Sequence, residues 1–415
     1  MNDPQNPKAK EPPSTDVPVE EAVAERARAA GVATQGLDWR NVILVPTLAL
    51  LAGLFVGALV MVFSDPDTLR SWASLGRNPG KALSDSWTLV YEAYSALFKG
   101  SLGSPRAISE TIVSATPLIF AGLAVALAFK AGLFNIGAEG QLLVGAMTSV
   151  YAGFTFDFLP GPVHVTAALI AGFLGGALWG FIPGFLKART GAHEVIVTIM
   201  LNYIGLLFVN FLLKSEIFIR SGRTDPITKP VAESAKLPPL LGAEYRVNAG
   251  FLVALAVAGA IWWLLFRSTV GFRFRTVGTN PNAALYAGMS VGGTYILAMV
   301  LSGGLAGLAG ASQLLGVQYS VFPGFSSGYG FDAIALALLG RTHPGGVVMA
   351  ALLFGVLRSG ATGMQAATSI PVDIIVVIQA LVIVFMAAPE LVRQIFRIRA
   401  DKQAEQDTLS ASWAT

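Results

Sequence analysis

Residues 122–147 read GLAVALAFKAGLFNIGAEGQLLVGAM and place polar side chains between two apolar runs. Lys130 ends the first run, and the second opens with Asn135, Glu139 and Gln141 inside or at the edge of hydrocarbon. A carboxylate there costs roughly 2.5–3.5 kcal/mol, so Glu139 needs a partner, a water-filled path or a substrate. Glycines on both sides favour an interrupted helix whose free backbone groups line a cavity. The alternative is an interfacial Glu139 that pairs with Lys130 or caps a helix.

The composition of the chain is that of an integral membrane protein. Of its 415 residues, 54% are hydrophobic and only 13% are charged, whereas soluble domains carry about 25% charged residues. The chain has no cysteine, and His164, His193 and His343 are too few and too scattered for a metal site. The net charge of +3 reflects a modest lysine and arginine excess that is typical of cytoplasmic membrane loops, so no nucleic-acid partner is expected.

Runs long enough to cross about 30 Å of hydrocarbon predict an all-α polytopic membrane protein with about ten transmembrane helices, some broken or re-entrant. The predicted spans are 41–63, 107–129, 132–153, 162–186, 195–213, 248–266, 292–315, 330–341, 345–357 and 371–388. The eighth and ninth are short and separated only by RTHPGG, so they could form one broken pair.

The distribution of charge predicts which ends of the helices face the cytoplasm. Residues 1–40 and 391–415 are expected to be cytoplasmic tails, the first disordered, around a transmembrane domain over 41–390. Two long polar segments, 64–106 and 214–247, then form outward loops. With this orientation the short outer loops contain only Arg358 among lysines and arginines. The short inner loops contain Lys130, Lys187, Arg189, Arg267, Arg273, Arg275 and Arg341.

Glycine recurs at a helical spacing in two of the predicted spans. Gly172, Gly176, Gly180 and Gly184 follow one another every four residues, and the segment SGGLAGLAGA at 302–311 repeats the pattern. Small faces of this kind let helix backbones approach closely in lipid. The glycines therefore predict a tightly packed helix bundle, although glycine is also common in membrane helices generally.

The inner segment 267–291 joins two strong spans and is too long for a simple turn. Asn280 can cap a helix, Pro281 suits its first turn, and Gly288 can end it. We therefore expect a short helix parallel to the membrane on the cytoplasmic face, with an exposed small face at Ala283, Ala284 and Gly288. A plain interfacial spacer is the alternative.

Further polar residues lie within apolar runs. Glu194, Asn202, Gln313 and Asp332 could each form a hydrogen bond between helices, and together they suggest a polar route. The chain has no GxxxxGK[ST] phosphate loop, because GRNPGK at 76–81 has the wrong spacing. It also has no serine nucleophile elbow and no HExxH helix, so a transport role is favoured over catalysis.

Four segments together resemble one known family. They are TPLIFAGLAVALAFKAGLFNIGAEGQ (116–141), GAHEVIVTIMLNYI (191–204), RTVGTNPNAALYAGMSV (275–291) and FDAIALALLGRTHPGGVVMAALLFG (331–355). They look like the transmembrane permeases of bacterial ABC importers in the branched-chain amino acid and ribose superfamily, and FNIGAEGQ is similar to the nucleoside and simple-sugar branch. The resemblance covers about residues 106–390.

The resemblance implies an importer of several chains in the bacterial inner membrane. Two permease subunits would pair with two cytoplasmic ATPases and with an outward substrate-binding lipoprotein or periplasmic protein. The two halves of the chain would form related bundles, and 276–290 would be the coupling helix that contacts an ATPase. No cofactor is expected.

The polar residues and the resemblance together predict a cargo and two sets of site residues. The expected cargo is a nucleoside, with a simple sugar as the alternative and an ion-coupled carrier using Glu139 or Asp332 as the rival. The predicted substrate path contains Asn135, Glu139, Gln141, Asn202 and Gln313. The predicted ATPase-coupling residues are Gly278, Asn280, Ala283, Ala284, Tyr286 and Gly288.

Overall fold

The computed structural model describes residues 44–76, 78–220, 222, 225–242, 244–368, 370, 372–387 and 394–396. The chain divides into two compact units, Met1–Leu48 and Ala49–Thr415. Of the first unit only residues 44–48 are described. The predicted tails, 1–40 and 391–415, lie outside the described residues apart from 394–396.

Regular structure in the described residues is helical, with only two isolated β-bridges, Ile219 with Thr228 and Pro239 with Asn248. The helices are α2 (Val45–Ser64), α3 (Pro66–Ala73), α4 (Pro79–Leu102), α5 (Pro105–Lys130), α6 (Ala138–Thr155), α7 (Gly161–Thr190), α8 (Glu194–Leu212), η2 (Glu233–Ala235), α9 (Gly250–Arg267), α10 (Thr269–Thr279), α11 (Pro281–Tyr286), α12 (Val291–Gln313), η3 (Leu314–Gln318), α13 (Tyr329–Leu339), α14 (Pro344–Ala367) and α15 (Val372–Ala387). Seven helical stretches of the described chain, in α2, α5, α7, α8, α9, α12 with η3, and α14, are long and apolar enough to cross a membrane. The prediction of an all-α, multi-pass membrane protein is confirmed.

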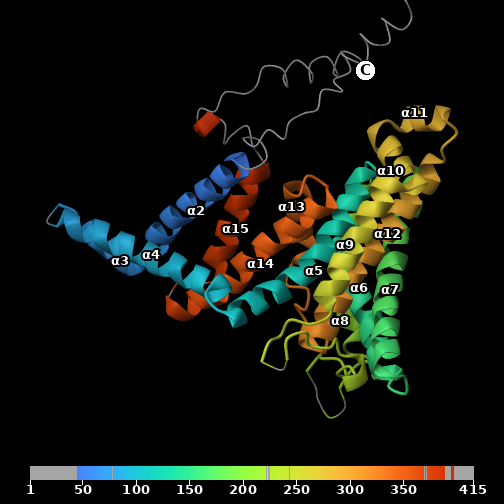
Figure 1. Ribbon diagram of the computed structural model, residues 1–415, viewed down its shortest axis with the longest axis horizontal. Coiled ribbons are helices and arrows are strands. Elements are labelled where there is room, and N and C mark those ends of the chain that lie inside the picture. The colour runs from blue at the N-terminus through green and yellow to red at the C-terminus, as the bar shows by residue number, and fades with distance from the viewer. Residues whose placement is uncertain are drawn as a thin grey trace, which may run out of the picture. The chain divides into compact units, whose positions relative to one another are not determined.

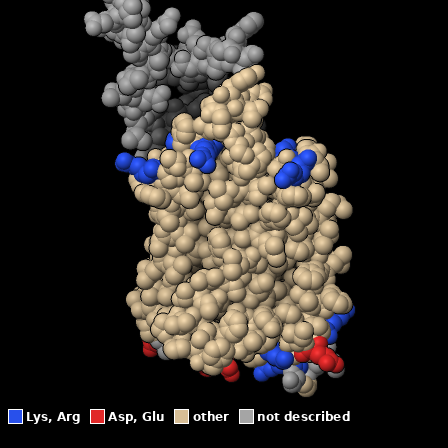
Figure 2. Space-filling model, turned by 90° about the vertical axis from the view of Figure 1, so that its right-hand side faces the viewer, with Lys and Arg blue, Asp and Glu red and all other residues tan. Residues whose placement is uncertain are grey.

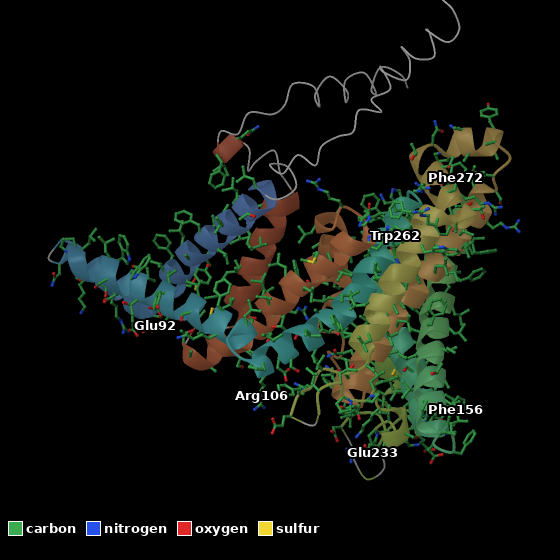
Figure 3. All side chains as sticks on the ribbon, viewed as in Figure 1. Glu92, Arg106, Phe156, Glu233, Trp262 and Phe272 are labelled. Atoms are coloured by element: carbon green, nitrogen blue, oxygen red, sulfur yellow. The ribbon has the colours of Figure 1, made fainter. Side chains whose placement is uncertain are left out.

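The surface also shows a band suited to hydrocarbon. On the face displayed in Figure 2, a broad zone without charged residues separates a border of lysines and arginines from a border with both signs of charge. Trp262 of α9 and Phe272 of α10 lie toward one end of the helices, whereas Phe156 and Glu233 lie toward the other (Figure 3). Charged residues gather beyond such a band because transfer of a charge into lipid is costly.

Each predicted span coincides with a helix, but the third begins six residues later than predicted and the ninth is longer than predicted. α13 has 11 residues, too few to cross the hydrocarbon alone, whereas α14 has 24 and continues past 357. The RTHPGG segment between them forms a turn in which Arg341 and Thr342 adopt positive φ and the His343 ring accepts a hydrogen bond from the Gly345 N–H. Because α14 continues to Ala367, Arg358 lies inside this helix, and its predicted place in an outer loop is wrong.

The segment 64–106, predicted to be a loop, is mostly helical. The Asp65 carboxylate caps α3 by accepting the Thr68 N–H at 2.8 Å, and Pro79 begins α4. The buried positions of α4 are Ala82, Ala93, Leu97 and Ser101, whereas its other positions are exposed or half-buried, so the helix is amphipathic. The sequence prediction missed this helix because four charged residues keep its hydropathy low. Its side of the membrane stays a prediction.

The closest helix packing in the large core lies between α7 and α12, which run side by side (Figure 1). Gly176 of α7 faces the Gly303 carbonyl and Gly307 of α12, while Gly307 faces the Gly172 carbonyl. A Cβ atom added at Gly176 or Gly307 would overlap facing backbone. The glycine spacing thus correctly predicts a tight interface, built by backbone contact rather than by side-chain interdigitation.

A second, smaller core lies where α2, α4, α14 and α15 meet, around Met61, Leu97 and Ile378. The Tyr94 hydroxyl of α4 donates a hydrogen bond to the Leu54 carbonyl of α2 at 2.5 Å. The described residues thus form one large and one small core. That the two halves of the chain are related bundles stays a prediction from the resemblance.

Candidate functional site

The helix predicted to be interrupted near Glu139 is broken in the structure. α5 ends at Lys130, α6 begins at Ala138, and the seven residues between them are not helical. Gly132 in this break has a φ of 73°, a conformation that glycine adopts without strain. The buried backbone groups of the break need hydrogen-bond partners within the protein.

Asn135 and Gln141 supply some of these partners. The Asn135 amide nitrogen donates to Gln141 Oε1 at 2.8 Å and to Ser302 Oγ at 2.7 Å, and the Gln141 amide nitrogen donates back to Asn135 Oδ1 at 3.1 Å. The Ser302 hydroxyl donates to the Ala124 carbonyl of α5, and Asn135 Oδ1 also accepts the Gly137 N–H. These buried side chains close a network between α5, α6 and α12. Asn135 and Gln141 therefore hold the break together, and neither lines the pocket described below.

Asn202 of α8 fastens the same break from the other side. Its Oδ1 accepts the Gly140 N–H at 2.9 Å, and its amide nitrogen donates to the Ile136 carbonyl at 2.8 Å. Gly140 lies in the first turn of α6, and Ile136 lies in the break just before it. In an unbroken helix the Gly140 N–H would bond to the Ile136 carbonyl, and the Asn202 side chain replaces this one hydrogen bond by partnering both groups.

Glu139 joins two helix N-termini. It lies in the first turn of α6, and its Oε2 accepts the Gly330 N–H of α13 at 2.8 Å, with the Ser326 side chain as a second hydrogen-bond partner. A carboxylate is stabilised at the N-terminus of a helix, where free N–H groups carry partial positive charge. Gly330 lies so close to the Glu139 backbone that a Cβ there would overlap it. Glu139 therefore caps a helix, which was one of the alternatives predicted from the sequence. It is buried, however, and the helix that it caps is α13.

The segment before α13 is held by Arg358, which the sequence did not mark as a site residue. Arg358 Nη2 of α14 lies 2.7 Å from Asp332 Oδ2 and 2.9 Å from the Ser327 carbonyl, and its guanidinium is 4.3 Å from the centre of the Tyr329 ring. The ion pair is about one-quarter exposed. The sequence does show Asp332 and Arg358 as charged residues within apolar runs, which is unusual in a membrane helix. Because they are 26 positions apart, only the fold reveals that they form an ion pair.

A pocket of about 390 Å³ opens beside Glu139, between α6, α8 and α13. Glu139 and Asn202 are its polar lining residues, and Tyr203 and Phe331 are its aromatic ones. The remaining lining is aliphatic: Ile136, Leu143, Ile199 and Leu206. A largely apolar pocket with a few converging polar groups is typical of small-molecule sites.

Two other polar residues lie apart from this pocket. Gln313 is buried at the end of α12, eleven residues beyond Ser302 and hence about 16 Å along the helix. Gln313 is not among the residues that line the pocket, so its place on the substrate path stays a prediction. Glu194 forms an ion pair with Lys187 at 2.8 Å, across the turn between α7 and α8.

The predicted short helix of the inner segment is α11. Asn280 caps it by accepting the Ala283 N–H at 3.0 Å, Pro281 is its first residue, and Gly288 follows it with a φ of 76°. Ala284, however, is fully buried, so the prediction that its side chain is exposed is wrong. A six-residue helix has a buried side as well as an exposed one, and alanine at 284 faces inward.

The exposed side of α11 carries larger residues. Leu285 is 64% exposed and Tyr286 is 93% exposed, whereas Ala283 and Gly288 are exposed but small. α10, which precedes α11, touches the broken helix directly: Gly278 lies against the Lys130 carbonyl and Gly132, so closely that a Cβ at Gly278 would overlap them. The inner segment is therefore in contact with the break that positions Glu139.

Comparison with known proteins agrees with this architecture. Residues 107–387 match the family described as "Branched-chain amino acid transport system / permease component". The guanosine ABC transporter permease protein NupP of Bacillus subtilis is 40% identical over 352 residues, which is 85% of this chain and 94% of NupP. The nucleoside ABC transporter permease protein NupB of Lactococcus lactis is 38% identical, over 83% of this chain and 90% of NupB.

A third relative carries a different cargo in its name. The glucose ABC transporter permease protein TsgB13 of Haloferax volcanii is 34% identical, over 84% of this chain and 88% of TsgB13. No solved structure matches the chain. The helices, the broken segment and these similarities show that the chain belongs to this family of ABC transporter permeases. It is a transport component rather than an enzyme.

Proposed function

We propose that this chain forms the translocation path for a nucleoside in an ATP-driven importer of the bacterial cytoplasmic membrane. The observation that carries the proposal is the pocket at the break between α5 and α6, where a carboxylate and two aromatic rings meet. Two relatives named as guanosine and nucleoside permeases, each matched over more than four-fifths of this chain, support the same cargo.

The lining of the pocket suits a neutral cargo with an aromatic base. Tyr203 and Phe331 offer ring faces, and Glu139 offers carboxylate oxygens as hydrogen-bond acceptors. No lysine, arginine or histidine is among the lining residues, so the pocket has no counter-charge for a phosphate. A nucleoside fits this chemistry better than a nucleotide does.

The proposed assembly contains further chains. A second permease subunit, either another copy or a homologous chain, would complete the path, and two cytoplasmic ATPases would supply energy. A substrate-binding lipoprotein or periplasmic protein would deliver the cargo from outside. The exposed Leu285 and Tyr286 of α11 support an ATPase contact, because exposed apolar side chains on a charged face gain stability when a partner covers them.

A simple sugar is the second candidate cargo, favoured by the similarity to the glucose permease TsgB13. Uptake of radiolabelled nucleosides and of glucose by cells with and without this chain distinguishes the two. We expect nucleoside uptake to depend on the chain and glucose uptake to be unaffected. Chain-dependent glucose uptake without nucleoside uptake would make the sugar the cargo.

The proposed orientation predicts the result of cysteine labelling. Because the chain has no cysteine, single cysteines at the exposed positions Glu244 and Thr279 can be labelled on a clean background. In intact cells an impermeant maleimide should label Glu244→Cys, which lies between α8 and α9, but not Thr279→Cys at the end of α10. Both should react after the cells are opened. Labelling of Thr279→Cys alone in intact cells would reverse the orientation and place α11 outside.

The proposed ATPase contact predicts the effect of changing the exposed side of α11. Leu285→Asp combined with Tyr286→Ala should reduce co-purification of the ATPase at least tenfold while the permease still inserts normally, because both side chains point away from the fold. Ala284→Trp should instead lower the amount of folded permease, since Ala284 is buried. Unchanged ATPase binding in the double variant would show that α11 is only a spacer.

A further inference from the structure

We infer that the pocket beside Glu139 is a nucleobase subsite, in which the Glu139 carboxylate reads adjacent N–H donors on the edge of the base. The inference rests on the proposed nucleoside cargo and goes beyond it, because it assigns the recognising group and the preferred kind of base. A guanine-type base, with a ring N–H beside an exocyclic amino group, presents such a donor pair.

The carboxylate is fixed in place before any ligand arrives. Its Oε2 accepts the Gly330 N–H at 2.8 Å, Ser326 is a second partner, and Glu139 itself is backbone-anchored in the first turn of α6. A carboxylate has about four lone-pair sites, so these two partners leave capacity for a donor pair on a ligand. A pre-positioned acceptor loses little freedom when the ligand binds.

Asn202 is less able than Glu139 to bind the edge of a base. Its Oδ1 and its amide nitrogen are already hydrogen-bonded to the Gly140 N–H and the Ile136 carbonyl, at 2.9 and 2.8 Å. The other lining residues are aliphatic or aromatic, and the Tyr203 hydroxyl offers a single oxygen where Glu139 offers a pair of acceptor oxygens. Glu139 is therefore the group in the pocket best able to distinguish one base edge from another.

Two aromatic residues supply the faces for the base. Tyr203 comes from α8 and Phe331 from α13, and both are more than half exposed although they line the same pocket. Aromatic rings stack on any base, so they contribute binding without selecting its edge. Selectivity is then assigned to Glu139 and general affinity to the two rings.

The Glu139 carboxylate also disfavours binding of phosphorylated nucleosides. No cationic residue lines the pocket, and Arg358, the cation that acts on Glu139, is already paired with Asp332, so a phosphate near Glu139 would meet like charge. A nucleoside monophosphate should therefore compete at least a hundredfold more weakly than the nucleoside.

Protection of an introduced cysteine tests the subsite in the complete importer. Ile199 lines the pocket, whereas the next residue, Met200, is exposed on α8 and does not, so Ile199→Cys and Met200→Cys form a matched pair. In reconstituted importer with its ATPases and binding protein, guanosine should slow maleimide labelling of Ile199→Cys at least fivefold and leave Met200→Cys unchanged. Equal protection of both positions, or of neither, would overturn the pocket assignment.

Comparison of guanosine with inosine, which lacks the exocyclic amino group, tests the role of Glu139. The quantity to measure is the concentration of each nucleoside that halves the rate of maleimide labelling of Ile199→Cys. It is measured in the importer with Glu139 and in the importer that also carries Glu139→Gln. The preference for guanosine over inosine should fall about tenfold in the variant, which is the contribution expected of one hydrogen bond to a charged group. Because the binding protein is the same in both importers, the change reports on the permease.

The outcomes separate this inference from the proposed function. If Glu139→Gln weakens guanosine and inosine equally, the carboxylate has a structural role alone and the inference is wrong. If the importer takes up nucleosides but Ile199→Cys is never protected, the subsite lies elsewhere while the nucleoside cargo stands. If no nucleoside is taken up, both fail.

Discussion

A valine at Gly307 is expected to remove nearly all folded protein from the membrane. The added side chain would collide with the Gly172 carbonyl and the Gly176 backbone of α7. Backbone atoms cannot move away by a change of rotamer, as the end of a flexible side chain can. Overpacking of a well-packed interior costs about 1–3 kcal/mol and occasionally more, and the cost here is expected to exceed this range because two facing backbones can be relieved only if α7 and α12 separate. The amount of protein that remains monodisperse after detergent extraction measures the effect.

Gly259→Val on α9 is the matched control. It makes the same substitution in a membrane helix, but nothing lies within 4 Å of the Cβ that would be added. The Gly259 variant should be extracted like the wild type. Normal yields of the Gly307 variant would contradict the backbone-to-backbone contact between α7 and α12.

Leucine at Glu139 is expected to abolish uptake, whereas glutamine should retain a substantial part of it. Leucine cannot accept the Gly330 N–H, and a buried donor without a partner costs about 1–3 kcal/mol. The α6 and α13 N-termini would then lose the group that joins them. Glutamine still offers one oxygen to this N–H. Initial rates of nucleoside uptake, normalised to the amount of permease in the membrane, measure the difference.

Glu216→Leu, which removes an exposed carboxylate outside the pocket, should transport like the wild type. Wild-type uptake in Glu139→Leu would refute the role given to the junction of α6 and α13. Equal and complete loss in the glutamine and leucine variants would mean that the negative charge itself is needed, as the ion-coupled rival requires.

Much of the helical framework could be predicted from the sequence because lipid imposes a simple rule. A spanning helix needs a long apolar run, and the predicted spans coincide with the helices of the structure. The cap at Asn280 and the glycine contacts of α7 and α12 also follow from local pattern. α4 was missed because Asp85, Glu92 and other charges mask its amphipathic helix.

The site was harder to predict because its contacts are between residues far apart in the chain. The sequence marks Asn135, Glu139 and Gln141 as unusual for a membrane segment, but it does not distinguish a residue that lines a pocket from one that closes a break. Only the fold brings Ser302 to Asn135, and Gly330 to Glu139. Likewise, whether Ala284 faces inward depends on what α11 packs against.

Uptake by the complete importer in sealed vesicles tests the central claim most directly. The permease, its ATPases and its binding protein are reconstituted, and radiolabelled guanosine is followed with ATP available to the ATPases, with a proton gradient alone, or with neither. We predict uptake with ATP, unaffected by a protonophore, and none with the gradient alone. Uptake that follows the proton gradient and persists without the ATPase subunits would contradict the account and identify an ion-coupled carrier.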